Sequence, residues 1–92
     1  MSKTSGVTTK VILDLLAGQD YKCALSGLDL EPNNAQLDHI VPSKLGGPHT
    51  PDNVQILHES VNRAKSAMLE EEFVALCHAV VAHTKKKNRK KK

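Results

Sequence analysis

Residues 37–65 read LDHIVPSKLGGPHTPDNVQILHESVNRAK, and the fold can be predicted from this segment. The pattern predicts a short strand over 35–41 and a loop that turns at Gly46-Gly47. A second short strand is expected over 54–57, and helical periodicity follows over 59–66. The sequence therefore predicts a β-hairpin and a helix that bring together polar residues far apart in the chain.

One further helix is expected on each side of this unit. Thr8 or Thr9 can cap a helix that carries an apolar stripe and ends at Gly18. The last helix is expected over 69–83, with acidic residues in its first turn and lysines after its end, as the helix dipole favours. Its apolar stripe would help to form the core through Phe73, Leu76, Cys77, Val80 and Val81. The predicted fold class is α+β, a ββα unit at about 35–67 flanked by an N-terminal and a C-terminal helix.

The basic residues are concentrated at the C-terminal end of the chain. Residues 85–92 hold seven of the thirteen lysines and arginines and no acidic residue, which leaves six basic against ten acidic residues elsewhere. We therefore expect one folded domain over 1–84 and a disordered basic tail over 85–92. Such a tail binds phosphates without reading sequence, although it can also serve solubility alone. The tail residues expected to contact nucleic acid are Lys85, Lys86, Lys87, Arg89, Lys90, Lys91 and Lys92.

Composition argues against several classes of protein. No apolar stretch approaches the roughly 20 residues that a membrane span needs, and the polar start of the chain is unlike a signal peptide. The two cysteines lie far apart, which fits a reducing cytosol better than a disulfide-bonded secreted domain. We therefore expect a cytoplasmic protein without a membrane partner.

An acidic residue and a histidine, Asp38 and His39, stand side by side near the end of the first predicted strand. Hydrolysis of a phosphodiester needs an activated water, a cation on the phosphate and help for the leaving oxygen. An imidazole suits the first task because it titrates near neutral pH. A carboxylate, an amide oxygen and retained waters suit Mg²⁺ or Mn²⁺. The neighbourhood therefore favours metal-assisted hydrolysis.

The spacing of these residues resembles the HNH endonuclease family, whose ββα-metal unit follows D-H-I-x-P, G-G, N-x-x-x-L and N-x-x-K. His39 and Asn53 lie fourteen positions apart, and Asn53 and Asn62 lie nine apart. The resemblance implies that His39 is the general base and that Asp38 and Asn62 bind one divalent cation, Mg²⁺ or Mn²⁺. Adjacent strand residues point to opposite faces, so a distortion at the strand end is expected to bring Asp38 and His39 into one site.

The same resemblance assigns supporting roles nearby. Asn53 is expected to brace the loop between the strands through its side-chain amide and so orient the base. Arg63 and Lys65 are expected to contact phosphates beside the scissile bond. Where the family motif has its second histidine, this chain has Asn62, so the site is an H-N-N variant. The side-chain carbonyl of asparagine favours Mg²⁺ over softer metals as a ligand. The role of His58 stays open between a helix N-terminal residue, an extra ligand and a phosphate contact.

Many family members hold the fold with zinc bound by two C-x-x-C pairs, and this chain departs from that pattern. The corresponding positions are Cys23, Ser26, His58 and Val61, whereas a structural zinc site needs four ligands. We therefore expect no structural zinc, and a small buried side chain at Cys23. The remaining histidines have no expected role; they are His49, His78 and His83.

The resemblance implies a metal-dependent DNA endonuclease that nicks one strand or cuts both and leaves 5′-phosphate and 3′-hydroxyl ends. Nothing in the 92 residues resembles a separate base-reading module, so specificity should come from a partner, a DNA structure or a dimer. Free-standing members of this size resemble those of phages and mobile elements, and a phage terminase is one candidate partner. Two alternatives stay open, a catalytically inactive DNA-binding module and a zinc-stabilised interaction domain. The oligomeric state is open as well.

Overall fold

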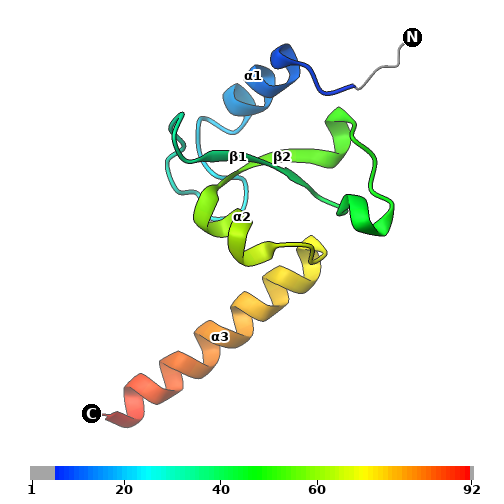
Figure 1. The fold of residues 1–92 in the computed structure, drawn as a ribbon. Coiled ribbons are helices and arrows are strands. Elements are labelled where there is room, and N and C mark those ends of the chain that lie inside the picture. The colour runs from blue at the N-terminus through cyan, green and yellow to red at the C-terminus, as the bar shows by residue number, and fades with distance from the viewer. Residues whose placement is uncertain (1–5, 92) are drawn as a thin grey trace.

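The structure, a computed structural model, describes residues 6–91 (Figure 1). Two strands form one antiparallel sheet, and three α-helices surround or extend from it. In chain order the elements are α1 (Thr9–Gly18), β1 (Ala35–His39), the 3₁₀ turns η1 (Ser43–Leu45) and η2 (Pro51–Asn53), β2 (Val54–His58), α2 (Glu59–Lys65) and α3 (Glu70–Lys91). This arrangement confirms the predicted α+β class and the ββα unit with a helix on each side.

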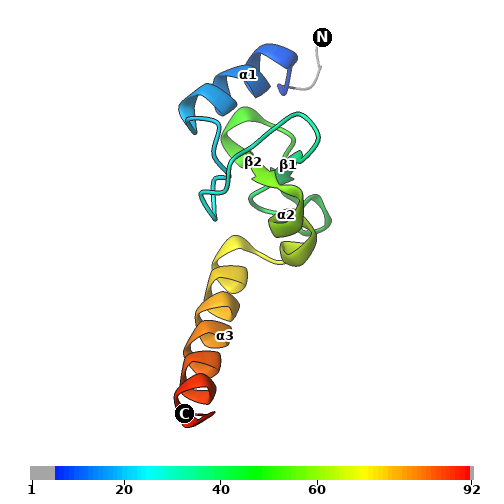
Figure 2. The same ribbon diagram turned by 90° about the vertical axis from the view of Figure 1, so that its left-hand side faces the viewer.

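The register of the hairpin is continuous. Ala35 pairs with His58 at one end and His39 with Val54 at the other, which sets Asp38 directly opposite Gln55. Helix α1 lies on one side of the hairpin and α2 on the other, as both ribbon views show (Figures 1 and 2). The hairpin is therefore the central layer, and α2 brings its own side chains back against β1.

The N-terminal helix is fixed at its start and at its end. The Thr8 hydroxyl caps α1 by accepting a hydrogen bond from the Val11 amide at 3.2 Å, so Thr8 is the cap of the two predicted candidates. Just beyond α1, the Gln19 side chain binds the backbone of Ile56 in β2, accepting from its N–H at 3.0 Å and donating to its carbonyl at 2.9 Å. Gln19 thus provides hydrogen-bond partners for backbone groups at the outer edge of β2, as a neighbouring strand would.

A small aliphatic core fills the space between α1, the hairpin and the loop that joins them. Its buried members come from the loop and from β2, and α1 and α2 cover them with partly buried side chains. The buried members are Cys23, Leu30, Ile56 and Leu57. Because this core is thin, polar contacts carry much of the positioning of the hairpin.

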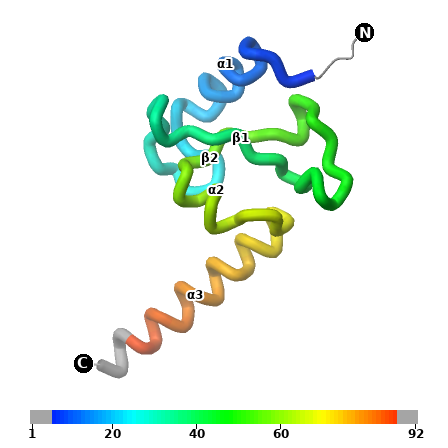
Figure 3. The backbone as a smooth tube through the Cα atoms, in the orientation of Figure 1, coloured from blue at the N-terminus to red at the C-terminus, as the bar shows by residue number. Residues whose placement is uncertain are grey.

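Helix α3 does not supply the core, and that prediction is wrong beyond the first turn of the helix. Of the expected stripe only Phe73 is buried, while Leu76, Val80 and Val81 are about half exposed at 51%, 53% and 50%. The physical reason is the turn before the helix, where Ser66 takes a φ of 52° and redirects the chain. As a result α3 leads away from the body as a projecting rod (Figure 3).

The basic C-terminal run is helical in the structure, where a disordered tail was predicted. Helix α3 continues through residues 85–91 to its last residue, Lys91. Lysine and arginine are good helix formers, and cations near a helix C-terminus complement its dipole. Lys92 lies outside the described residues, and the domain limit at residue 84 stays a prediction. Within residues 6–91, no helix combines the length and the hydropathy that crossing a bilayer requires.

Candidate active site

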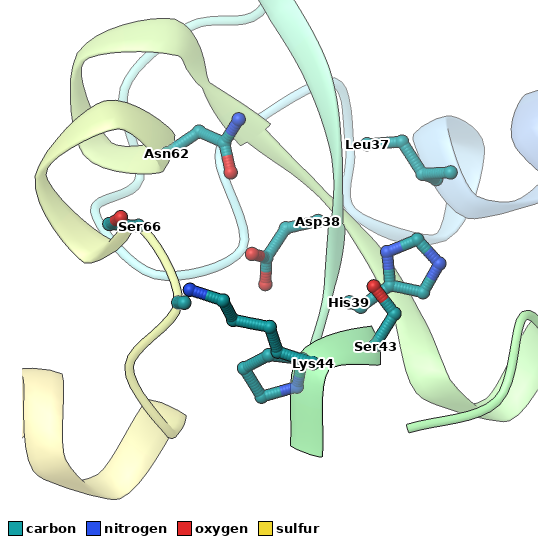
Figure 4. Close-up of a pocket in the computed structure, with 9 residues that line it drawn as sticks. Leu37, Asp38, His39, Ser43, Lys44, Asn62 and Ser66 are labelled. Carbon is teal, nitrogen blue, oxygen red and sulfur yellow. The ribbon is translucent and has the colours of Figure 1, made fainter. Parts of the chain in front are cut away.

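A cleft of about 320 Å³ opens at the end of β1, where three segments of the chain meet (Figure 4). The strand, the loop that follows it, and the end of α2 with the turn beyond it each contribute part of the wall. The lining residues are Leu37, Asp38, His39, Pro42, Ser43, Lys44, Asn62, Ser66 and Ala67. The fold thus brings Asp38, His39 and Asn62 to one cavity.

The Asp38 carboxylate is held in place by two donors. It is only 5% exposed. Its Oδ2 accepts a hydrogen bond from Gln55 Nε2 at 3.0 Å, across the hairpin, and its Oδ1 accepts from Lys65 Nζ at 3.1 Å. Gln55 also donates to Glu70 Oε1 at 3.1 Å, which links the carboxylate to the start of α3. A carboxylate oxygen has two acceptor positions, so each Asp38 oxygen can still take a further partner.

Lys65, expected to contact phosphates, is instead fully buried. Its side chain is 0% exposed and its ammonium donates to Asp38 Oδ1 and, at 3.2 Å, to the backbone carbonyl of His39. As the last residue of α2, its side chain is turned inward against β1. The phosphate-contact prediction for Lys65 is therefore wrong in this structure, where the lysine ties α2 to the strand that carries the candidate ligand and base.

The His39 ring meets a second histidine. Its Nε2 lies 2.9 Å from Nδ1 of His49, within hydrogen-bonding distance, and the ring centroids are 5.1 Å apart. Figure 4 shows the Asp38 carboxylate and the His39 ring on opposite sides of β1. The register at this strand end is unbroken, so the expected distortion is not present. Both residues line the same cleft, although their side chains lie on different sides of the strand.

Asn62 brings an amide oxygen to the cleft. Its Nδ2 donates to Gln36 Oε1 at 2.7 Å, which orients the amide, and its Oδ1 faces the side of the cleft where Asp38 lies (Figure 4). Residues 6–91 contain no group of three or more His, Cys, Asp or Glu side chains that could hold a metal ion. One carboxylate with one amide oxygen instead fits a hard cation that keeps most of its waters, such as Mg²⁺ or Mn²⁺.

Asn53 closes the loop between the strands. Its Oδ1 accepts from the Val41 N–H at 2.9 Å, and its Nδ2 donates to the carbonyls of Val41 at 3.1 Å and Pro48 at 2.8 Å. This is the bracing placement that the sequence suggested, although Asn53 makes backbone contacts and does not line the cleft. A Cβ on Gly47 would lie 1.7 Å from the Val41 carbonyl oxygen, so the loop can close this tightly only with glycine there.

The other predicted contacts lie at the surface. His58 caps α2, since its Nδ1 accepts a hydrogen bond from the Ser60 N–H at 3.1 Å, which matches the first of its three candidate roles. Arg63 is exposed and lies 3.7 Å from Glu59, a weak surface pair that leaves the guanidinium available. The described basic side chains near the end of α3 are exposed too; they are Lys85, Lys86 and Lys87.

Three residues around the site were not predicted from the sequence. Lys44 lines the cleft and its side chain reaches across it in Figure 4, and its place just before Gly46-Gly47 was the only signal in the sequence. His49 contacts the candidate base, and Gln55 holds the candidate metal ligand. Neither contact has a local signature, because each depends on how the hairpin and its loop fold back.

The four positions that match the zinc-binding pairs of other family members do not form a zinc donor set. Cys23 is buried and free. Burial raises the pKa of its thiol, but hydrogen bonds from the Ser26 side chain and from nearby backbone groups, that of His58 among them, outweigh this effect and hold the pKa below its ordinary value. Val61 packs against the core. A thiol and an imidazole, beside a hydroxyl and an aliphatic side chain, supply two of the four ligands that a structural zinc site needs.

Comparison with known proteins now identifies the family. The family model described as HNH endonuclease matches residues 22–68, just over half of the chain. The chain belongs to the HNH endonuclease family. The crystal structure of the Type II-C Cas9 enzyme from Actinomyces naeslundii is similar to this HNH chain, with a TM-score of 0.67 and 29% sequence identity. The match covers 80% of this chain and 8% of that enzyme, and no curated protein matches.

Proposed function

We propose that this HNH domain is a metal-dependent DNA endonuclease that hydrolyses phosphodiesters to 5′-phosphate and 3′-hydroxyl ends. The observation that carries the proposal is the cleft itself, which a histidine, an aspartate and an asparagine line together. An imidazole suits proton abstraction from water, and the two kinds of oxygen suit a hard cation. The flanking surface supplies positive charge for a polyanion through Lys44 and Arg63.

Each residue then has a defined task. His39 takes the proton of the attacking water, and Asp38 and Asn62 supply the oxygen ligands of one divalent cation. HNH nucleases generally use such a metal ion, which when bound neutralises charge on the scissile phosphate and the leaving oxygen. Lys65 and Gln55 keep the Asp38 carboxylate aimed at the cleft through their hydrogen bonds. Lys44 provides a cation at the cleft that can contact a phosphate.

The proposed substrate is DNA, nicked one strand at a time because one such site attacks one phosphodiester. The α3 lysines add affinity without sequence preference. We propose that the enzyme acts in the cytoplasm of a bacterial cell and is encoded by the host or by a phage. The comparisons give no support for a phage terminase as partner, so the proposal names DNA alone.

Nicking of supercoiled plasmid in Mg²⁺, in Mn²⁺ and in EDTA tests this function. We expect conversion to open circles in either metal, none in EDTA, and loss of activity in His39→Ala. His83→Ala is the matched control, because His83 is an exposed histidine on α3. DNA binding without cleavage in every metal would favour the inactive binding module instead. Tightly held stoichiometric zinc, with a fold lost to chelator, would favour the zinc-stabilised interaction domain.

A further inference from the structure

The contact between His39 and His49 has no part in the function proposed above. His49 lies in the loop between η1 and η2 and is exposed, yet its Nδ1 is 2.9 Å from His39 Nε2. We infer that His49 is a positioning residue that fixes which ring nitrogen of His39 carries the proton. This inference rests on the proposed function, since it assigns His49 a role only if His39 acts as a base.

The direction of the hydrogen bond decides whether His39 can accept a proton. If His49 Nδ1 donated, the Nε2 lone pair of His39 would be occupied and its Nδ1 would carry the ring proton. A neutral His39 in that state has no free lone pair for a water proton. If His39 Nε2 donates instead, its Nδ1 lone pair is free. Catalysis therefore requires His39 to donate from Nε2 and His49 to accept at Nδ1, with the ring proton of His49 on its own Nε2.

This arrangement also favours the charged state that forms during reaction. When water gives its proton to His39 Nδ1, the ring becomes an imidazolium that keeps its Nε2–H directed at His49. A hydrogen bond from a cation is stronger than one from a neutral ring, so the contact stabilises the transition state more than the ground state. No proton leaves the pair in this step, and the bond that breaks is the O–H bond of the attacking water.

The position of His49 is set by Asn53. The Asn53 side chain donates a hydrogen bond to the carbonyl of Pro48, which precedes His49, at 2.8 Å. The Asn53 N–H donates to the carbonyl of Thr50, which follows His49, at 2.9 Å. Both neighbours of His49 are thus tied to the same asparagine. This gives a physical route by which Asn53, outside the cleft, orients the base through His49.

The test compares three substitutions at position 49. In asparagine the amide lies where histidine Nδ1 lies, whereas in glutamine it lies where Nε2 lies, and alanine has no polar group. We expect His49→Ala and His49→Gln to lower the kcat of plasmid nicking roughly tenfold with KM unchanged, and His49→Asn to keep most of the activity. An equal kcat in the three variants at position 49 would overturn the inference. If His39→Ala is inactive in the same assay, the proposed function remains intact.

A measurement on the free protein separates the two claims. The ¹⁵N shifts of the His39 ring report which nitrogen carries the proton, whether or not the protein cleaves DNA. We expect the Nε2–H form of neutral His39 in the wild type and a mixture of both forms in His49→Ala. A wild-type ring with its proton on Nδ1, or a ring unchanged by His49→Ala, would contradict the inference. Absence of nicking by the wild type would instead contradict the proposed function.

Discussion

Lys65 and Asp38 form a buried ion pair, with side-chain exposures of 0% and 5%. Such a pair adds little net stability, because desolvation of both charges offsets much of their attraction. Loss of one partner is nevertheless costly, because it leaves the other charge buried and unpaired. The carboxylate that we propose as a metal ligand is thus also part of what holds α2 to β1.

Replacing Lys65 by methionine should destabilise the protein strongly. We expect Lys65→Met to lower the free energy of unfolding by about 3 kcal/mol in urea titrations, because Asp38 keeps its burial and loses its cation. The double variant Lys65→Met with Asp38→Asn should recover part of this loss. Arg63→Met, on the exposed side of the same helix, is the control and should change stability by less than about 0.5 kcal/mol. Similar effects in Lys65→Met and Arg63→Met would count against the buried pair.

The spacing in the sequence indicated that three candidate site residues meet, and they line one cleft, but the direction of several side chains was predicted wrongly. Asp38, His39 and Asn62 meet because the hairpin and helix fold back in the order that the spacing indicated. The inward turn of Lys65 could not be predicted, because a lysine at the end of a short helix is most often solvated. The contact made by His49 depends on a closed loop conformation that no local pattern encodes.

Helix α3 packs on the rest of the molecule only near its start. Phe73 is 8% exposed, whereas Leu76, one turn further on, is 51% exposed. An apolar residue contributes to stability in proportion to the surface it removes from water, so these two should differ sharply.

Truncation of each side chain measures this difference. We expect Phe73→Ala to cost about 3 kcal/mol of unfolding free energy, and Leu76→Ala less than about 0.5 kcal/mol. Chemical denaturation followed by circular dichroism checks both values. A cost for Leu76→Ala equal to that of Phe73→Ala would mean that α3 packs on the body beyond its first turns.

Element positions were predictable to within a few residues, except at the C-terminal end of α3. The strands and α2 follow from the apolar pattern and the turn residues, and a threonine cap at position 8 or 9 follows from the hydroxyl that both residues carry. The direction of α3 does not follow, because an apolar stripe indicates a face without showing whether the preceding turn brings that face to the core. Here the turn at Ser66 directs it away.

At the scale of the whole molecule, charge is divided between an acidic body and a basic helix end. Residues 85–92 carry seven cations, which would repel one another in the absence of a polyanion. Binding of DNA would relieve that repulsion and release counterions from the DNA.

Deleting residues 85–92 should weaken DNA binding and reduce its salt dependence while leaving the chemistry intact. If all seven cations contact phosphates, the slope of log K against log salt falls in magnitude by roughly 6. Binding titrations from low to physiological salt measure the slope, and single-turnover nicking at saturating enzyme measures the chemical step. Unchanged affinity at every salt concentration would contradict a DNA-binding role for this end of α3.

The role of His39 as the base of a metal-dependent nuclease can be measured as a single ratio. That ratio is the initial rate of plasmid nicking in Mg²⁺ by the wild type divided by the rate for His39→Ala. We predict a ratio of at least about 100, the usual contribution of a positioned general base. Equal rates for the two proteins, or no nicking by the wild type, would contradict the account.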